Sequence, residues 1–321
     1  MAFVFAGVAG LLCARVVSGQ DVPRIGFLSA LSYHAFPSRI DAFRQGLKHL
    51  GYTEGRNIII EYRWADGKPE RLPAFAAELE RLKVAVIVSA GPSATRPARQ
   101  ATRHTPIVMG FDSDPVGSGF VDSLARPGGR ITGLSFLAPE VSAKQVDLLR
   151  QVIPNLARLA LLADPQEPGN TRAVQETNQA AVAAGVQVHM VDARAFKAIE
   201  EAFASAQKER AQAIIVLPSP LFTAGLKTVV KTAASHRIPA MYWTAHHVEA
   251  GGLMSYSTNV DDLFRRAAIY VDKILKGAKA ADLPVEQPHK FDLIINLKAA
   301  KEIGLSIPME VLARADRVIQ N

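Results

Sequence analysis

The sequence alternates short apolar runs with amphipathic helical patterns, and it does so twice. In the first round, four apolar runs are predicted as strands, at residues 24–28, 57–64, 84–88 and 106–109. The second round carries four more, at residues 156–163, 186–191, 213–217 and 238–243. Val84–Val88 is apolar throughout, as in strands that are buried on both faces. Strands that alternate with helices form parallel sheets covered by helices, so two rounds predict two such units.

The connections predict how the two units are joined. Gly128–Leu134 links the two rounds and is rich in glycine, which suits a hinge. If the periodic helix at 259–277 returns to the first sheet, the chain crosses between the units three times. The predicted fold class is therefore α/β, with two doubly wound parallel-sheet lobes joined by a three-segment hinge. The predicted N-terminal lobe comprises 24–132 plus 257–284, and the C-terminal lobe comprises 133–256 plus 285–321. The predicted hinge residues are Gly133, Leu134, Tyr256 and Ser257.

The first residues have the character of an export signal. Residues 1–14 carry no charged side chain, and the apolar run is shorter than the ~20 residues of a membrane-spanning helix. We predict that residues 1–20 are a signal peptide and that the mature protein is periplasmic. Leu12 stands where a lipoprotein signal has a small residue, which argues against a lipid anchor at Cys13. Cys13 is the only cysteine, so the mature chain needs no disulfide, and this suits an oxidising compartment.

Charge and motif content exclude several classes of function. The chain has 37 Lys and Arg against 30 Asp and Glu, and the densest basic cluster is only Arg96, Arg99 and Arg103. No basic run is interleaved with aromatic residues, so nucleic acid is not a predicted partner. The segment before the first strand is too short and too apolar for the helix-turn-helix of a transcription regulator.

Enzyme signatures are also lacking. The sequence has no G-x-S-x-G, no G-x-x-x-x-G-K-[ST] and no H-E-x-x-H. His246, His247 and Glu249 are close in sequence, but neighbouring residues point in different directions, which favours a solvated loop over a shared metal. We therefore predict no catalytic activity, no cofactor and no metal. An exported α/β enzyme is the alternative, since residues of a catalytic triad meet only in space.

Ligands of open α/β sheets bind beyond the carboxyl ends of the strands, so polar residues that follow strands are candidate contacts. Ser89, Gly91 and Ser93 lie at the start of a predicted helix, where N–H groups and the helix dipole favour a ligand carboxylate. Ordinary N-capping by Ser93 is an equal alternative. Asp112 and Asp114 follow the fourth strand and suit a ligand ammonium. An acid–base pair, or a turn capped by Asp114, is the other interpretation.

The second lobe contributes amide and aromatic candidates. Asn170 suits either a ligand contact or a helix cap, and the aromatic residues after two strands suit stacking on a ligand. For Phe222 and Trp243, packing beneath the cleft floor is the alternative. The predicted ligand-binding residues are Ser29, Tyr33, Ser89, Gly91, Ser93, Asp112, Asp114, Asn170, Ser219, Phe222 and Tyr242.

Several segments together resemble one family. They are Pro23–Ser29, Phe43–Leu47, Leu50–Gly55, Ile60–Ala65, Asp114–Gly117, Ser123–Gly129, Gly251–Tyr256 and Lys290–Asn296. They resemble the ABC transporter substrate-binding proteins with a type I periplasmic binding fold, some of which bind aromatic amino acids. The resemblance implies an extracytoplasmic, monomeric protein that closes on a small solute, an amino acid or related carboxylate, and delivers it to an inner-membrane permease. A sensor subunit that feeds a signalling receptor is a further alternative.

Overall fold

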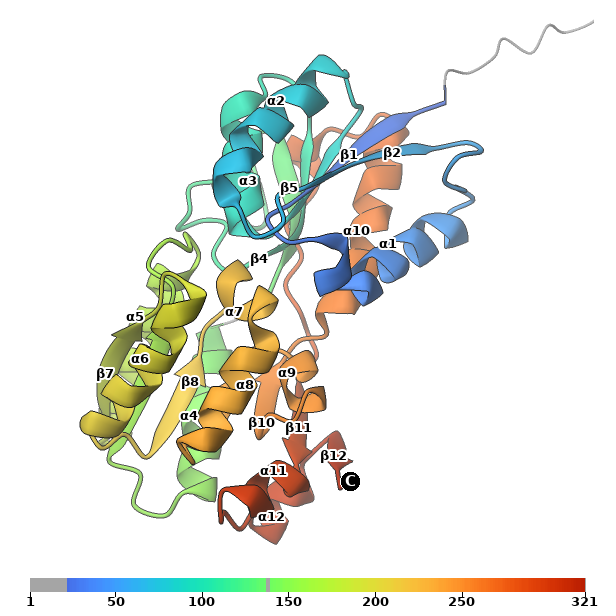
Figure 1. The fold of residues 1–321 in the computed structure, drawn as a ribbon. Helices are drawn as coiled ribbons and strands as arrows, with labels where there is room; N and C mark the ends of the chain where they lie inside the picture. The colour runs from blue at the N-terminus through green and yellow to red at the C-terminus, as the bar shows by residue number, and fades with distance from the viewer. Residues whose placement is uncertain (1–21, 137–138, 321) are drawn as a thin grey trace, which may run out of the picture.

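The computed structural model describes residues 22–136 and 139–320 and forms two α/β lobes, one above the other in Figure 1. The predicted signal peptide, with Cys13, lies outside the described residues. The first sheet has the order β2-β1-β3-β4-β5, and all its neighbouring strands are parallel. Its strands are β1 (Arg24–Ser29), β2 (Ile59–Trp64), β3 (Ile87–Ala90), β4 (Ile107–Asp112) and β5 (Ile131–Ser135).

Helices cover both faces of the first sheet. They are α1 (Pro37–His49) and α10 (Val260–Leu275) on one face, and α2 (Leu72–Arg81) and α3 (Pro92–Ala101) on the other. Helices α1 and α10 touch at Gly46, where an added Cβ would lie 2.3 Å from the Arg265 carbonyl oxygen. Glycine is thus needed for this close approach. Because α10 follows the strand Met254–Ser257 of the second sheet in sequence, its place here shows that the chain returns to the first lobe.

The second lobe is a sheet of order β12-β11-β10-β9-β8-β6-β7, parallel except between β10 and β11. The strands are β6 (Arg158–Ala163), β7 (Gln187–Asp192), β8 (Ala213–Val216), β9 (Ala240–Tyr242), β10 (Met254–Ser257), β11 (Asp292–Asn296) and β12 (Arg317–Ile319). The helices are α4 (Pro139–Val152), α5 (Asn170–Ala183), α6 (Phe196–Lys208), α7 (Pro220–Ala224), α8 (Leu226–Ser235), α9 (Ala245–Glu249), α11 (Leu297–Glu302) and α12 (Met309–Leu312). Buried residues pack on both faces of this sheet, in two separate clusters. The predicted architecture of two helix-covered lobes is confirmed.

The crossings between lobes lie one to three residues beyond the predicted boundaries. Gly133 and Leu134 belong to β5 of the first sheet, so the first crossing follows Ser135. Gly133 has a φ of +131°, and an added Cβ would lie 2.3 Å from the Met109 carbonyl oxygen. Glycine is therefore needed at this position both for the close pairing of β5 with β4 and for the positive φ of the backbone. Ser257 is the last residue of β10 in the second sheet, and Val285 packs in the core of the first lobe.

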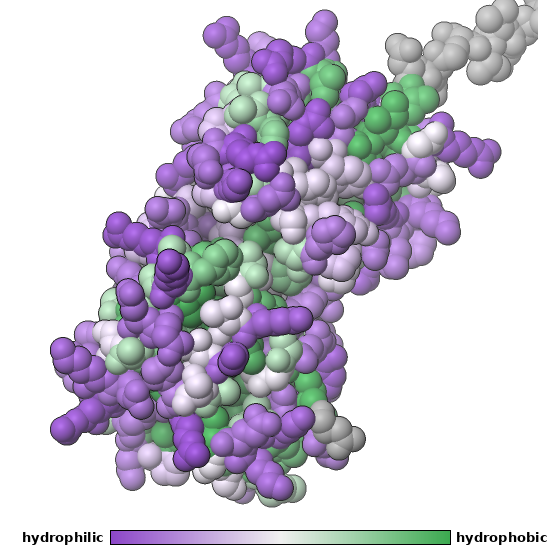
Figure 2. Space-filling model, in the orientation of Figure 1, coloured by the Kyte–Doolittle hydropathy of each residue, from purple (hydrophilic) through white to green (hydrophobic). Residues whose placement is uncertain are grey.

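Hydrophilic side chains cover most of the face of both lobes shown in Figure 2. Within the described residues, no helix is both long enough and apolar enough to span a bilayer.

Candidate functional site

A small cavity, of about 30 Å³, lies between the lobes, at the carboxyl ends of strands from both sheets. This is where the sequence predicted a ligand. The first lobe lines it with Leu31, Arg39, Ala90, Gly91, Pro92, Ser93, Phe111 and Ser113. The second lobe lines it with Glu167, Pro218, Ser219, Pro220, Thr223 and Trp243. We call this space the interlobe cavity.

Helix α3 begins at the wall of the interlobe cavity. Gly91 adopts a φ of +95° and is the N-cap residue, so the predicted capping alternative for Ser93 is not observed. The Ser93 hydroxyl makes no hydrogen bond of ordinary geometry within residues 22–136 and 139–320, although it is close enough to Glu167 to lower the pKa of that carboxyl. Ser89 instead bonds internally, with its Oγ 2.8 Å from Thr95 Oγ1. The N-terminal turn of α3 therefore offers the Ser93 N–H and hydroxyl to an anion in the cavity, since Pro92 has no N–H and the Ala94 and Thr95 N–H groups donate to the Gly91 carbonyl.

Several buried acceptors lie at one corner of the interlobe cavity, which we call the acidic corner: Glu167, which lines the cavity, and Asp112 and Asn170, which lie behind its lining. Asp112 is 0% exposed and stands between the lining residues Phe111 and Ser113. Its Oδ1 accepts the Asp114 N–H at 2.9 Å, while its Oδ2 finds no partner in the described part of the chain. Glu167 Oε1 and Asn170 Oδ1 are buried without a described partner as well.

The electrostatics of the acidic corner favour a cation. Burial raises the pKa of Asp112 to about 8, and the Asp114 N–H opposes this shift. Burial also raises the pKa of Glu167 to about 8, helped by the carboxylates of Asp112 and Asp164. In each case burial outweighs the groups that stabilise the charged form, such as Arg96 for Asp112 and Ser93 for Glu167, so an incoming ammonium would find acceptors already in place.

The other side of the interlobe cavity carries a buried cation among aromatic rings. Arg39, on α1, is 4% exposed, and its guanidinium carbon lies 3.9 Å from the centre of the Phe36 ring. The rings of Phe111 and Trp243 follow at 5.5 and 5.6 Å. Burial lowers the pKa of Arg39 to about 10, and the charge of Asp261 opposes the shift. The Arg39 Nε and Nη2 atoms have no hydrogen-bond partner among the residues described.

The structure places some of the predicted residues away from the cavity surface. Phe222 and Tyr242 are 0% and 1% exposed and pack in the core of the second lobe, because they face the sheet rather than the cleft. For Phe222 the packing alternative holds. Trp243, one residue after Tyr242, does line the cavity. Tyr33 packs edge-on against Trp64, with ring centres 6.1 Å apart.

Other predicted residues support the loops around the cavity. Ser29 Oγ accepts the Leu31 N–H at 3.1 Å and thereby shapes the turn after β1. Ser219 lines the cavity, and its hydroxyl donates to Asp164 at 2.7 Å. Asp114 caps the turn at Gly117 with an N–H···O distance of 2.9 Å, as the alternative interpretation held.

Sequence reasoning missed Arg39 and Glu167, although each left a signal. Arg39 precedes Phe43 by four residues and therefore lies on the buried face of α1. A charged residue in the apolar stripe of a helix is costly unless it meets a partner. Glu167 follows β6, so the rule that selected Asp112 after β4 applied to it equally.

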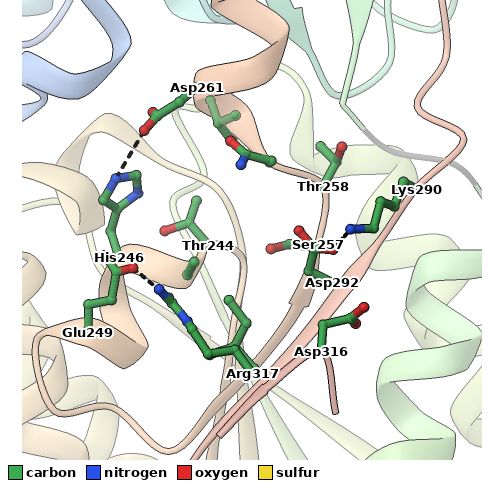
Figure 3. A pocket seen from close by; sticks show the side chains of 14 residues that line it. Thr244, His246, Glu249, Ser257, Thr258, Asp261, Lys290, Asp292, Asp316 and Arg317 are labelled. Carbon is green, nitrogen blue, oxygen red and sulfur yellow. Dashed lines mark hydrogen bonds and ion pairs between the residues drawn. The ribbon is translucent and has the colours of Figure 1, made fainter. Parts of the chain in front are cut away.

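A second pocket, of about 310 Å³, lies near the crossings and is shown in Figure 3. We call it the hinge-side pocket. Several of its charged side chains form ion pairs: Arg317 with Glu249, Lys290 with Asp292 at 3.0 Å, and His246 with Asp261 at 3.7 Å. In the described part of the chain, His246 Nδ1 and Asp261 Oδ1 are nevertheless buried without a hydrogen-bond partner.

The histidines beside the hinge-side pocket do not form a metal site. His247 is buried and stacks on Tyr242, with ring centres 5.1 Å apart, whereas His246 contacts Ser38 and Asp261 of the other lobe. Over residues 22–136 and 139–320, no group of three His, Cys, Asp or Glu side chains could hold a metal ion.

Two α/β lobes with a cavity at facing strand ends are the architecture of two-lobed solute-binding proteins. The profile of the ABC transporter substrate binding protein family matches residues 24–319, and the chain belongs to this family. The resemblance seen in the sequence is thereby confirmed.

Known relatives are substrate-binding proteins. A tyrosine-binding protein of Clostridioides difficile (strain R20291) is 22% identical over 282 residues, which cover 88% of this chain and 81% of the relative. A solved ABC domain from Streptococcus pneumoniae in complex with L-Trp is 28% identical, covers 92% of this chain and 99% of its own, and superposes with a TM-score of 0.87. A conserved domain protein from Vibrio cholerae is 26% identical, with coverages of 93% and 100% and a TM-score of 0.88.

Proposed function

We propose that the protein is the extracytoplasmic solute-binding component of an ABC importer, which captures an amino acid in the interlobe cavity and delivers it to an inner-membrane permease. One observation carries the proposal: buried acceptors without partners and a helix N-terminus meet at a cavity that both lobes line. An amino acid carries both the ammonium and the carboxylate that these groups would receive. The relatives described as binding tyrosine and L-Trp support this solute class.

In the proposed complex, the acidic corner holds the ammonium of the solute. Asp112 and Glu167 supply charge, and Asn170 supplies a neutral acceptor. The N-terminal turn of α3, with Ser93, holds the carboxylate. These contacts come from both lobes, so the solute would bind the closed form more tightly than the open form and shift the population toward closure.

The lobes already touch around the interlobe cavity. Arg172 of the second lobe lies 3.6 Å from Asp114 of the first. An added Cβ on Gly169 would lie 2.9 Å from the Ser113 Cβ across the cleft. We propose that opening and closing occur at the three crossings, beside the predicted hinge residues Gly133, Leu134, Tyr256 and Ser257.

A ligand screen tests the proposal. Protein freed of bound solute by unfolding and refolding is melted in the presence of each common L-amino acid, and calorimetry then measures the affinity of those that stabilise it. We expect at least one amino acid to raise the melting temperature, and we expect it to be recovered chemically unchanged, as an enzyme substrate would not be. If no amino acid stabilises the protein and another solute co-purifies with it, the proposed function is wrong.

A further inference from the structure

We propose that Arg39 receives an anionic group on the side chain of the solute, so that the solute is an amino acid with a second acidic group. This inference rests on the proposed function of the interlobe cavity and goes beyond it. The relatives are described with tyrosine and tryptophan, whose side chains are neutral.

The first argument is the unsatisfied state of Arg39. Its side chain is buried, its Nε and Nη2 have no hydrogen-bond partner within the described residues, and the charge of Asp261 acts on it without an ion pair between the two. The nearby rings of Phe36, Phe111 and Trp243 interact with the face of the cation but accept none of its in-plane N–H groups. A buried charge without a partner is costly, so the missing partner is expected to come from the ligand.

The second argument is the geometry of the free donors. Nε and Nη2 form one edge of the guanidinium, and this edge fits the two oxygens of a carboxylate. The Phe36 ring covers one face of the guanidinium at 3.9 Å and so restricts its rotation. A neutral aromatic ring could stack on the guanidinium, but it would leave both donors unpaired. An anion satisfies them.

The third argument is the separation of the cavity's polar groups. The ammonium and the α-carboxylate of an amino acid are assigned to the acidic corner and to the start of α3. Arg39 comes from a different element, α1, and is not needed for either group. It therefore has the role of a third anchor, at the side-chain end of the solute.

The test compares acidic amino acids with their amides. L-Aspartate, L-glutamate and L-α-aminoadipate are measured by calorimetry beside L-asparagine, L-glutamine, L-tyrosine and L-tryptophan. We expect one acidic amino acid to bind at least about 30-fold more tightly than its amide, the scale of a buried charge pair. If neutral amino acids bind as tightly as acidic ones, the inference is wrong while the proposed function stands. If no amino acid binds, the proposed function itself fails.

The variant Arg39→Met tests whether the preference for an acidic amino acid over its amide depends on this residue. The variant should bind the acid and its amide within about threefold of each other. Its ligand-free melting temperature should stay equal or rise, because an apolar side chain replaces an unpaired buried cation. A fall of several degrees would show that Arg39 has a structural role and would overturn the inference. Arg44→Met is the matched control on the same helix, since Arg44 pairs with Glu54 outside the cavity, and it should leave the preference unchanged.

Discussion

The interlobe cavity and the hinge-side pocket differ in how their charges are satisfied. The hinge-side pocket has about ten times the volume, about 310 against about 30 Å³, and many charged residues line it. Its charges form pairs such as Lys290 with Asp292 (Figure 3), although His246 and Asp261 each keep one buried atom without a hydrogen-bond partner in the described chain. In and beside the interlobe cavity, Arg39, Asp112 and Glu167 carry such atoms and form no ion pair within the described residues.

This difference teaches that volume does not mark the binding site. Charges that pair with one another near solvent are already stabilised and gain little from a ligand. Buried charges without partners are costly in the empty protein, and a ligand that completes them recovers that cost. We therefore propose the smaller cavity as the site, and this ranking can be tested by treating both regions alike.

The largest expected effect is on affinity when the acidic corner is neutralised. We expect Asp112→Asn combined with Glu167→Gln to weaken binding of the most stabilising amino acid by at least about 30-fold, because a buried ammonium loses its counter-charge. Asp292→Asn in the hinge-side pocket is the control and should change affinity less than twofold. Calorimetry measures both. Equal losses in the two regions would contradict the comparison.

The second effect is a dependence of the stability of the ligand-free protein on pH. The pKa values of Asp112 and Glu167 are raised to about 8 from the ordinary 3.8 and 4.5. Between these limits the folded state holds more protons than the unfolded state, so the free energy of unfolding falls as pH rises from about 4 to about 8. Melting temperatures across this range should fall more steeply in the native protein than in the double variant.

The comparison with the double variant is needed because buried histidines also make the stability of the protein depend on pH. Burial lowers the pKa of His247 to about 3, and that of His246 is lowered by burial too. For His247 the unfolded state holds more protons between about pH 3 and 6.5, so its contribution rises with pH over that range. Because both proteins contain these histidines, the difference between them reports the carboxyl groups. Parallel melting curves would show that the carboxyl groups are already compensated in the empty protein.

The sequence predicted the fold better than the site, for a physical reason. Strand and helix patterns such as Val84–Val88 depend on local periodicity, which a single chain displays directly. The strand β5 was missed because Gly133 hides its pattern, and the short edge strand β12 carries little apolar signal. Which side chains end without a partner depends on how the two lobes meet. Asp112 and Ser93 were correctly placed near the cavity, but only the structure shows that Asp114 is paired and Arg39 is not.

The third effect is a loss of affinity when the lobes are kept from closing fully around the interlobe cavity. Gly169→Ala places a methyl group against Ser113 and Pro92 of the other lobe, and Gly169 has an ordinary φ of −80°, so the substitution strains contacts rather than backbone. We expect affinity to fall about tenfold, on the scale of about 1 kcal/mol or more for an overpacked contact. The melting temperature of the empty protein should change little if the lobes open slightly. Gly129→Ala, which meets nothing within 4 Å, is the control. Unchanged affinity in Gly169→Ala would mean that the bound state does not require this contact.

The smallest effect compares two ion pairs, only one of which joins the lobes. Arg172 pairs with Asp114 across the cleft, while Arg317 pairs with Glu249 within the second lobe. The two arginine side chains are similarly exposed, at 46% and 48%, but Asp114 is 12% exposed and Glu249 43%, so solvent screens the Arg172 pair less. Arg172→Gln should raise the dissociation rate of the solute two- to threefold, because the closed form loses a contact that the open form lacks, worth less than about 1 kcal/mol. Arg317→Gln should leave that rate unchanged, and 0.5 M salt should remove the difference between the native protein and Arg172→Gln. Stopped-flow dissociation measures all three rates. Equal effects of the two substitutions would show that the Arg172 pair does not hold the lobes together.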